Sequence, residues 1–328
     1  MIVGAHHYID SSTVDALAEL QKLGGARVIL ATAPSAKAIS DVVSGLGVNG
    51  DLLIAAVAND PLTVSVMPLL AGRRQISSWY SGIARDSQEA EFYLRVFSGQ
   101  GLSNADTTGS GTPGVVTANG NQVSFRNPFL SFIARQLASD ELAHVRALRT
   151  TIPELGGTPV ARPTIDLDGA WQAFASGAGL HRPFRPLESE TDFLLAAFYF
   201  EENDVPALRG VASLLQSATV KDAITGTLGD EGYHGGFLRL AISEIGLVER
   251  GVLQDAERIQ SYRNQLIANP ADELPGLFDQ SGNPLLAPVN ALGQTPTQTA
   301  REHLNLLYLN RNATAGGFFP NGLNGAIR

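Results

Sequence analysis

The stretch Ser139-Asp140-Glu141-Leu142-Ala143-His144 places a carboxylate three residues before an imidazole, and Gly229-Asp230-Glu231-Gly232-Tyr233-His234 repeats this spacing further along the chain. On an α-helix, residues three apart lie on one face, one turn from each other. Two such Glu-x-x-His pairs that face each other across a helical bundle can hold a pair of metal ions, with one carboxylate from each of two more helices. The two stretches therefore predict an all-α bundle with a dinuclear metal site.

Further carboxylates lie on two more predicted helices. A helix is predicted to begin at residue 187, and its body over residues 193–200 is hydrophobic nearly all round. It leads into acidic residues, and Pro206 is expected to kink it without ending it. A shorter helix is predicted over residues 86–97, and the two Glu-x-x-His pairs lie on helices predicted at about residues 128–150 and 220–245. A single Glu-x-x-His is usually a solvated surface pair, but two copies with apolar flanks favour a metal site. The predicted ligands are Glu141, His144, Glu201, Glu231 and His234, completed by Asp86 or Glu89, with Glu202 and Glu91 as alternatives on their helices.

The fourth predicted helix is unusually rich in glycine. Each glycine inside a helix costs about 1 kcal/mol of stability relative to alanine. We therefore expect these residues to make room for a neighbouring helix or a metal ion. They are Gly226, Gly229, Gly232, Gly235 and Gly236.

The length, net charge and cysteine content of the chain argue against several classes of function. The chain has 328 residues, 44% of them hydrophobic, which predicts a globular protein of two domains. The net charge of −9 and the lack of any Lys/Arg cluster argue against nucleic acid or a membrane surface as a partner. The absence of cysteine excludes thiolate metal sites and disulfides. With no signal-peptide pattern at residues 1–6, a cytoplasmic location is expected, although a secreted origin of the later part of the chain stays open.

Residues 1–80 have a different pattern. Strands predicted at residues 5–9, 27–32, 51–57 and 75–79 alternate with helices at residues 12–23 and 35–45, which is typical of parallel βαβ units. His6 and His7 are neighbours in a predicted strand, so their side chains point to opposite faces and a structural role is favoured over metal binding.

The amino-acid sequence of this segment resembles a known protein family. GAHHYID at residues 4–10, LQKLGGARVILATAP at residues 20–34 and GRR at residues 72–74 are similar to the nucleotide-binding domain of zinc-type medium-chain alcohol dehydrogenases. The resemblance, over about residues 1–87, implies a partial Rossmann-like unit. It lacks the Gly-rich turn that holds a pyrophosphate, so NAD is not an expected cofactor. An incompletely covered sheet of this kind predicts a homo-oligomer formed through it.

The rest of the chain resembles the ferritin-like domain of the desiccation-related proteins. The resemblance rests on EAEFYL at residues 89–94, FIARQLASDELAHVR at residues 132–146, FLLAAFYFE at residues 193–201, EGYH at residues 231–234 and the tail GGFFPNGLNG at residues 316–325. It implies iron or manganese as the metal and an association with stress. In that family the first helix supplies its ligand seven residues before the position of Tyr93, which is Asp86 here, so a truncated first helix with a shortened ligand is expected.

Together these patterns predict a multi-domain chain. A partial Rossmann-like unit is expected over residues 1–84, an all-α ferritin-like four-helix bundle over residues 85–250, and peripheral helices with a wrapping tail over residues 251–328. The predicted function is a stress-associated metal protein that handles iron or oxygen species. The alternatives are a non-enzymatic protective scaffold and, with less support, an NAD-dependent oxidoreductase.

Overall fold

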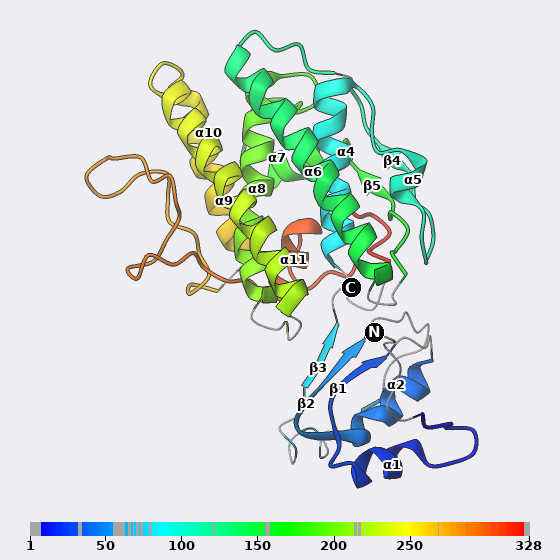
Figure 1. The fold of residues 1–328 in the computed structure, drawn as a ribbon. Helices are drawn as coiled ribbons and strands as arrows, with labels where there is room; N and C mark the ends of the chain where they lie inside the picture. The colour runs from blue at the N-terminus through cyan, green and yellow to red at the C-terminus, as the bar shows by residue number, and fades with distance from the viewer. Residues whose placement is uncertain are drawn as a thin grey trace. The chain divides into compact units, whose positions relative to one another are not determined.

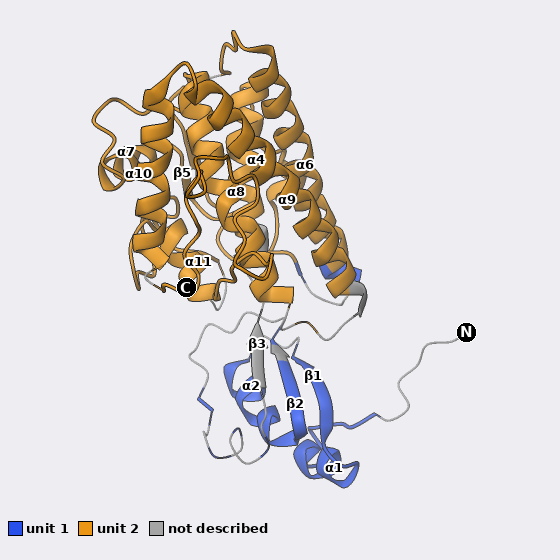
Figure 2. Cartoon of the chain, turned by 90° about the vertical axis from the view of Figure 1, so that its left-hand side faces the viewer, with its two compact units in different colours: residues 1–80, 152–158, 325–327 blue, residues 81–151, 159–324, 328 orange. Residues whose placement is uncertain are grey.

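The computed structural model describes residues 8–31, 35–54, 63–64, 67, 69, 72, 75–78, 81–120, 122–154, 158–212, 215, 218–267 and 269–324. The chain is rich in helices and holds only small parallel sheets (Figure 1). It divides into two compact units (Figure 2). Unit 1 comprises residues 1–80, 152–158 and 325–327, and unit 2 comprises residues 81–151, 159–324 and 328.

Unit 1 is built around a three-stranded parallel sheet in the order β1-β2-β3, as the alternating pattern predicts. Helix α1 begins at Ala16, later than predicted, because the Asp15 side chain accepts hydrogen bonds from the Leu17 and Ala18 N–H groups and caps the helix there. His6 and His7 lie outside the described residues, and residues 8–9 of the predicted first strand are not in a strand. The elements are α1 (Ala16–Lys22), β1 (Ala26–Ala31), α2 (Ala36–Val42), η1 (Val43–Gly45), β2 (Leu46–Ile54) and β3 (Gln75–Ser78).

The core of unit 1 is small. Apolar side chains of α2 and η1 pack against β2, and the buried members of this cluster are Ile39, Val43, Leu46, Leu52 and Ile54. The strand β1 leaves Val28 and Leu30 close to half exposed.

Unit 2 contains four long helices that carry every predicted ligand: α4 (Ser81–Ser98), α6 (Pro128–Glu154), α8 (Glu190–Ala212) and α9 (Ala218–Gly246). All four were predicted, and Pro206 lies inside α8 as expected. The expected truncation of the first helix is wrong, because α4 begins at Ser81, five residues before the predicted start at residue 86. Ala84 and Arg85, in this added turn, are buried, so the helix continues where the unit can cover it. No described helix is both long enough and apolar enough to cross a membrane.

Shorter elements surround these helices. Three of them are the helices α7, α10 and α11, and α11 begins with a capping box between Thr299 and Glu302. The short strand β4 pairs in parallel with the distant β5. The bounds are α5 (Asn104–Thr107), β4 (Val116–Thr117), β5 (Ile165–Asp166), α7 (Gly169–Gly177), α10 (Arg250–Ile267) and α11 (Ala300–Leu307).

An aromatic cluster joins the long helices to the C-terminal tail. The Trp171 ring of α7 lies 5.5 Å from Phe92 of α4, 5.0 Å from Phe200 of α8 and 4.7 Å from Phe318 of the tail, measured between ring centroids. The Asp166 N–H donates to the Phe318 carbonyl at 2.9 Å, which anchors the tail to β5. The tail over residues 316–324, red in Figure 1, is therefore part of the core of unit 2.

The glycines of α9 do not have the role predicted for most of them. A Cβ added at Gly226, Gly229 or Gly232 would meet no atom of the described residues within 4 Å. Only Gly235 and Gly236 come near other segments, at 3.9 Å from the Glu201 carbonyl oxygen and 3.6 Å from the Leu286 carbonyl oxygen. Within the described residues, the expectation of close approach is therefore wrong for the first three glycines.

Candidate metal centre

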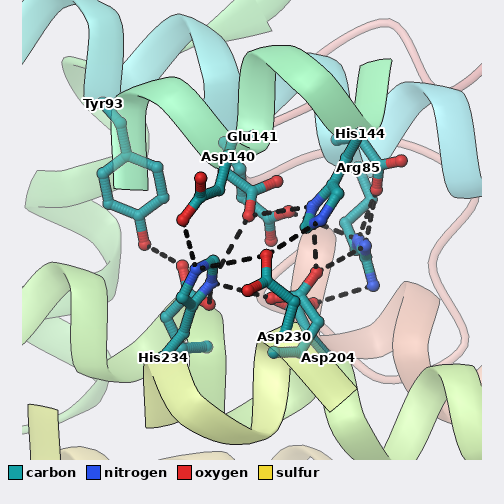
Figure 3. A network of polar contacts seen from close by, with 12 residues as sticks. Arg85, Tyr93, Asp140, Glu141, His144, Asp204, Asp230 and His234 are labelled. Carbon is teal, nitrogen blue, oxygen red and sulfur yellow. Dashed lines mark hydrogen bonds and ion pairs between the residues drawn. The ribbon is translucent and has the colours of Figure 1, made fainter. Parts of the chain in front are cut away.

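Four fully buried side chains from three helices converge inside unit 2. Glu141 of α6, Glu201 of α8, and Glu231 and His234 of α9 each offer a ligand atom, and these atoms all lie within 4.8 Å of one another. The His234 Nδ1 atom is 3.1 Å from Glu201 Oε2, 3.2 Å from Glu231 Oε2 and 3.7 Å from Glu141 Oε1. Figure 3 shows the side chains of α6 and α9 pointing toward one another across this group. We call these four residues the carboxylate–histidine group.

The hydrogen bonds of Glu201 and Glu202 show which of these two adjacent carboxylates belongs to the carboxylate–histidine group. Glu202 points away from the group and receives two hydrogen bonds of 2.6 Å from the guanidinium of Arg239, which is itself fully buried. Glu201 instead accepts a hydrogen bond of 2.5 Å from the Tyr93 hydroxyl of α4. Adjacent residues on a helix point about 100° apart, so one carboxylate fastens α8 to α9 while its neighbour enters the group.

The outer nitrogens of the two imidazoles are held by aspartates from the opposite helix. His234 Nε2 of α9 lies 3.2 Å from Asp140 Oδ2 of α6, and His144 Nε2 of α6 lies 3.2 Å from Asp230 Oδ2 of α9. Each aspartate immediately precedes the glutamate of its own Glu-x-x-His pair. The inner nitrogens therefore face the buried carboxylates: His144 Nδ1 is 3.3 Å from Glu141 Oε1 and 3.5 Å from Glu231 Oε1. Because the side chains of Asp140 and Asp230 are 20% and 41% exposed, solvent reaches this side of the site.

A second group of carboxylates adjoins the first on α4. Asp86, Glu89 and Glu141 also have ligand atoms within 4.8 Å of one another, so Glu141 belongs to both groups. We call these three residues the α4 group. Both predicted alternatives on this helix, Asp86 and Glu89, are thus brought to the site. Glu91 is not, because it pairs with Arg162 and, at 3.0 Å, with Arg95.

The guanidinium of Arg85 lies among the carboxylates of the α4 group. Its nitrogens are 2.6 Å from Asp86, 3.3 Å from Glu89, 3.0 Å from Asp204 and 3.3 Å from Glu231. The Arg85 side chain is only 4% exposed. Asp204 lies three residues after Glu201 on α8 and is completely buried.

The charges of the site do not balance within the described residues. One guanidinium and two imidazoles face six buried carboxylates: Asp86, Glu89, Glu141, Glu201, Asp204 and Glu231. Neither oxygen of Glu141 accepts a hydrogen bond of normal geometry from a described residue, although the side chain has no exposed surface. Burying carboxylates without a partner is costly, so either protons or a cation must compensate them. Three carboxylates and one imidazole are a donor set that suits iron or manganese.

The pKa values of the site residues indicate how protons compensate the buried carboxylates when no metal is bound. Burial, with repulsion from Glu231, raises the pKa of Glu141 to about 8, and burial raises that of Glu201 to about 6. Burial would also raise the pKa of Glu231, but His234 and Arg85 lower it to about 2. Burial would lower the pKa of His144, but its interaction with Glu141 raises it to about 10. At neutral pH the metal-free site therefore holds protons that a bound cation would displace.

Six of the predicted ligands belong to the two groups, His144 lies beside them, and the alternatives Glu202 and Glu91 lie elsewhere. The sequence patterns did not indicate four charged residues and one tyrosine of the site. The signal for Asp140 and Asp230 was present, since both precede the glutamate of a Glu-x-x-His pair. Asp204 follows Glu201 at the same three-residue spacing and could have been found in that way. Arg85 and the Tyr93 hydroxyl gave no signal, because their roles depend on how α4 packs.

Comparison with known proteins agrees with this geometry. Residues 83–244 match the family model described as the ferritin-like domain. The chain is similar to a ferritin-like catalase of Nesocodon mauritianus, with 29% identity over 257 residues, 73% of this chain and 80% of that protein. It is also similar to a desiccation-related protein of Craterostigma plantagineum, with 27% identity over 163 residues, 48% of this chain and 49% of that protein. The predicted resemblance to the desiccation-related proteins is confirmed.

The predicted resemblance to alcohol dehydrogenases is confirmed as well. An alcohol dehydrogenase of Penicillium expansum is 46% identical over 88 residues, which are 27% of this chain and 26% of that protein. The chain thus spans about a quarter of the length of the alcohol dehydrogenases that it matches.

Proposed function

We propose that the ferritin-like domain binds a divalent iron or manganese ion in the carboxylate–histidine group and acts on iron or on oxygen species. The observation that carries this proposal is the convergence of Glu141, Glu201, Glu231 and His234, all buried, within 4.8 Å of one another. The oxygens of Glu141 add to it, because neither accepts a hydrogen bond of normal geometry within the described residues although the side chain is completely buried. Redox chemistry at a bound ion is what such a centre would supply.

The surrounding residues would support the ion in defined ways. The hydrogen bond from Tyr93 orients the Glu201 carboxylate. Asp140 and Asp230 fix the two imidazoles so that Nδ1 points inward, as carboxylates behind metal-bound histidines do. The aromatic side chains Phe92 and Phe200 cover the side of the site near Tyr93 and keep water from it. The ferritin-like relative named as a catalase favours peroxide as the oxygen species.

The finer architecture belongs to the same proposal. We infer that α4, α6, α8 and α9 form the four-helix bundle of a ferritin-like fold, over residues 85–250, with residues 251–328 packed around it. Residues 1–84 are proposed to be a partial Rossmann-like unit, supported by its parallel three-stranded sheet and its likeness to alcohol dehydrogenases. A homo-oligomer formed through that sheet stays a prediction.

Metal analysis of the full chain, purified without chelator, tests the proposal. We expect iron or manganese in the wild type, and at least a tenfold lower content in Glu231→Gln and His234→Ala. Glu244→Gln, an exposed position on the same helix, and His181→Ala, an exposed histidine, are the matched controls and should keep the wild-type content.

The alternative of a non-enzymatic protective scaffold gives a different result in the same samples. It predicts that neither metal nor chelator changes the melting temperature, and that the variants and controls contain equal, negligible metal. A metal content near zero in the wild type that the substitutions leave unchanged would contradict the proposed metal binding.

A further inference from the structure

The two groups of possible ligands share one residue, and they differ in how many of their carboxylates contact a positively charged side chain. Glu141 belongs to both the carboxylate–histidine group and the α4 group, as a carboxylate between two cation positions would. Within the described residues, a permanently charged side chain contacts both remaining members of the α4 group. In the other group it contacts only Glu231, at 3.3 Å.

Arg85 is that side chain, and its position is fixed from several sides. Its guanidinium contacts Asp86 and Glu89 from its own helix, Asp204 from α8 and Glu231 from α9. An arginine cannot lose its proton inside a protein, so it carries a positive charge whatever else is bound. With its side chain only 4% exposed, it has no solvated position to occupy while it keeps these contacts.

We propose that the Arg85 guanidinium stands in place of a second metal ion, so that the chain binds one divalent ion, in the carboxylate–histidine group, and not two. The proposal rests on the metal-binding function proposed above and specifies its stoichiometry. Asp86 and Glu89 are then the partners of an internal cation and not metal ligands. Asp204 completes the cradle of the guanidinium from α8, which explains why a buried aspartate occurs there.

In this arrangement a fixed cation, Arg85, contacts the carboxylates of the α4 group, and a separate, exchangeable cation would bind in the carboxylate–histidine group. The guanidinium contacts the carboxylates of α4 and Asp204 with or without a metal, and these contacts attach α4 to α8 and α9. The carboxylate–histidine group keeps Glu141 without a hydrogen bond and stays available for an exchangeable ion. A divalent ion placed in the α4 group would stand next to the guanidinium charge, and this repulsion disfavours it.

Titration of the chelator-treated full chain with Mn²⁺ tests the inference, with free Mn²⁺ followed by electron paramagnetic resonance. We expect one ion per wild-type chain and two per chain of Arg85→Met, which keeps an unbranched apolar stem and removes the charge. Arg85→Lys, the matched control that keeps a cation, should bind one. Circular dichroism shows whether each variant is folded.

Each outcome decides a different claim. Two ions in the wild type, or one ion in a folded Arg85→Met chain, overturn the inference and leave the proposed metal function standing. No ion in the wild type overturns the proposed function and the inference with it. If Arg85→Met does not fold, the wild type alone decides: at saturating Mn²⁺, the spectrum of an isolated ion supports the inference, and that of an exchange-coupled pair contradicts it.

Discussion

Raising the pH should destabilise the metal-free chain, because its buried carboxyl groups keep protons that the unfolded chain loses. Burial raises the pKa of Glu141 from 4.5 to about 8. Between these values the folded chain binds more protons at this residue than the unfolded chain, so the free energy of unfolding falls as the pH rises. His144, whose pKa is raised from 6.5 to about 10, acts in the same direction in the upper part of this range. Glu231 has the opposite sign, but its window lies below its ordinary pKa of 4.5.

The size of this effect follows from the number of protons involved. One proton difference corresponds to about 1.4 kcal/mol per pH unit, so Glu141 alone should lower the free energy of unfolding by about 2–3 kcal/mol between about pH 6 and about pH 8. Urea denaturation of the chelator-treated chain at the two pH values measures it. A bound ion would replace the protons, so saturating Mn²⁺ should flatten the dependence.

Glu141→Gln provides the control for this prediction, because glutamine keeps the shape of the side chain and does not titrate. Its free energy of unfolding should depend less on pH than that of the wild type. A metal-free wild type whose stability stays constant or rises over this range would refute the assignment of protons to the buried group.

Three further predictions concern stability and are measured by urea denaturation of the full chain. Glu202→Gln should cost about 3–5 kcal/mol, because it leaves the buried Arg239 without a carboxylate partner, and a smaller loss would show that this pair does not hold α8 to α9. Phe318→Ala should cost about 3–5 kcal/mol, because this tail residue is fully buried against Trp171, and an unchanged midpoint would mean that the tail is not part of the core. Gly226→Ala should stabilise the chain by about 0.5–1 kcal/mol, since α9 has space for the added methyl group, and a destabilised variant would contradict this.

Much of the helical architecture could be predicted from local patterns. The two Glu-x-x-His pairs and the apolar run before Glu201 located three of the four long helices, since residue periodicity is set by the helix itself. The start of α4 could not be found in this way. The first turn of α4 lies in the part of the sequence that resembles alcohol dehydrogenases. The burial of Ala84 depends on tertiary packing in unit 2, which local sequence patterns do not show.

The site was predictable where one helix determines the geometry and not where several meet. The spacing of Glu141 with His144 and of Glu231 with His234 needed only the helical repeat. The role of Arg85 depends on four carboxylates from three helices, which sequence spacing does not reveal. The glycines of α9 were misinterpreted for a related reason, because a residue without a side chain shows only in the folded chain whether anything lies beside it.

The central claim is that a metal ion binds among Glu141, Glu201, Glu231 and His234, and pulsed electron paramagnetic resonance tests it most directly. In the chain loaded with Mn²⁺, the electron spin echo should be modulated by a directly coordinated ¹⁴N nucleus, that of His234. The modulation should be lost or strongly reduced in His234→Ala and unchanged in His181→Ala. Bound Mn²⁺ without nitrogen modulation in the wild type, or with the same modulation after His234→Ala, would contradict the account.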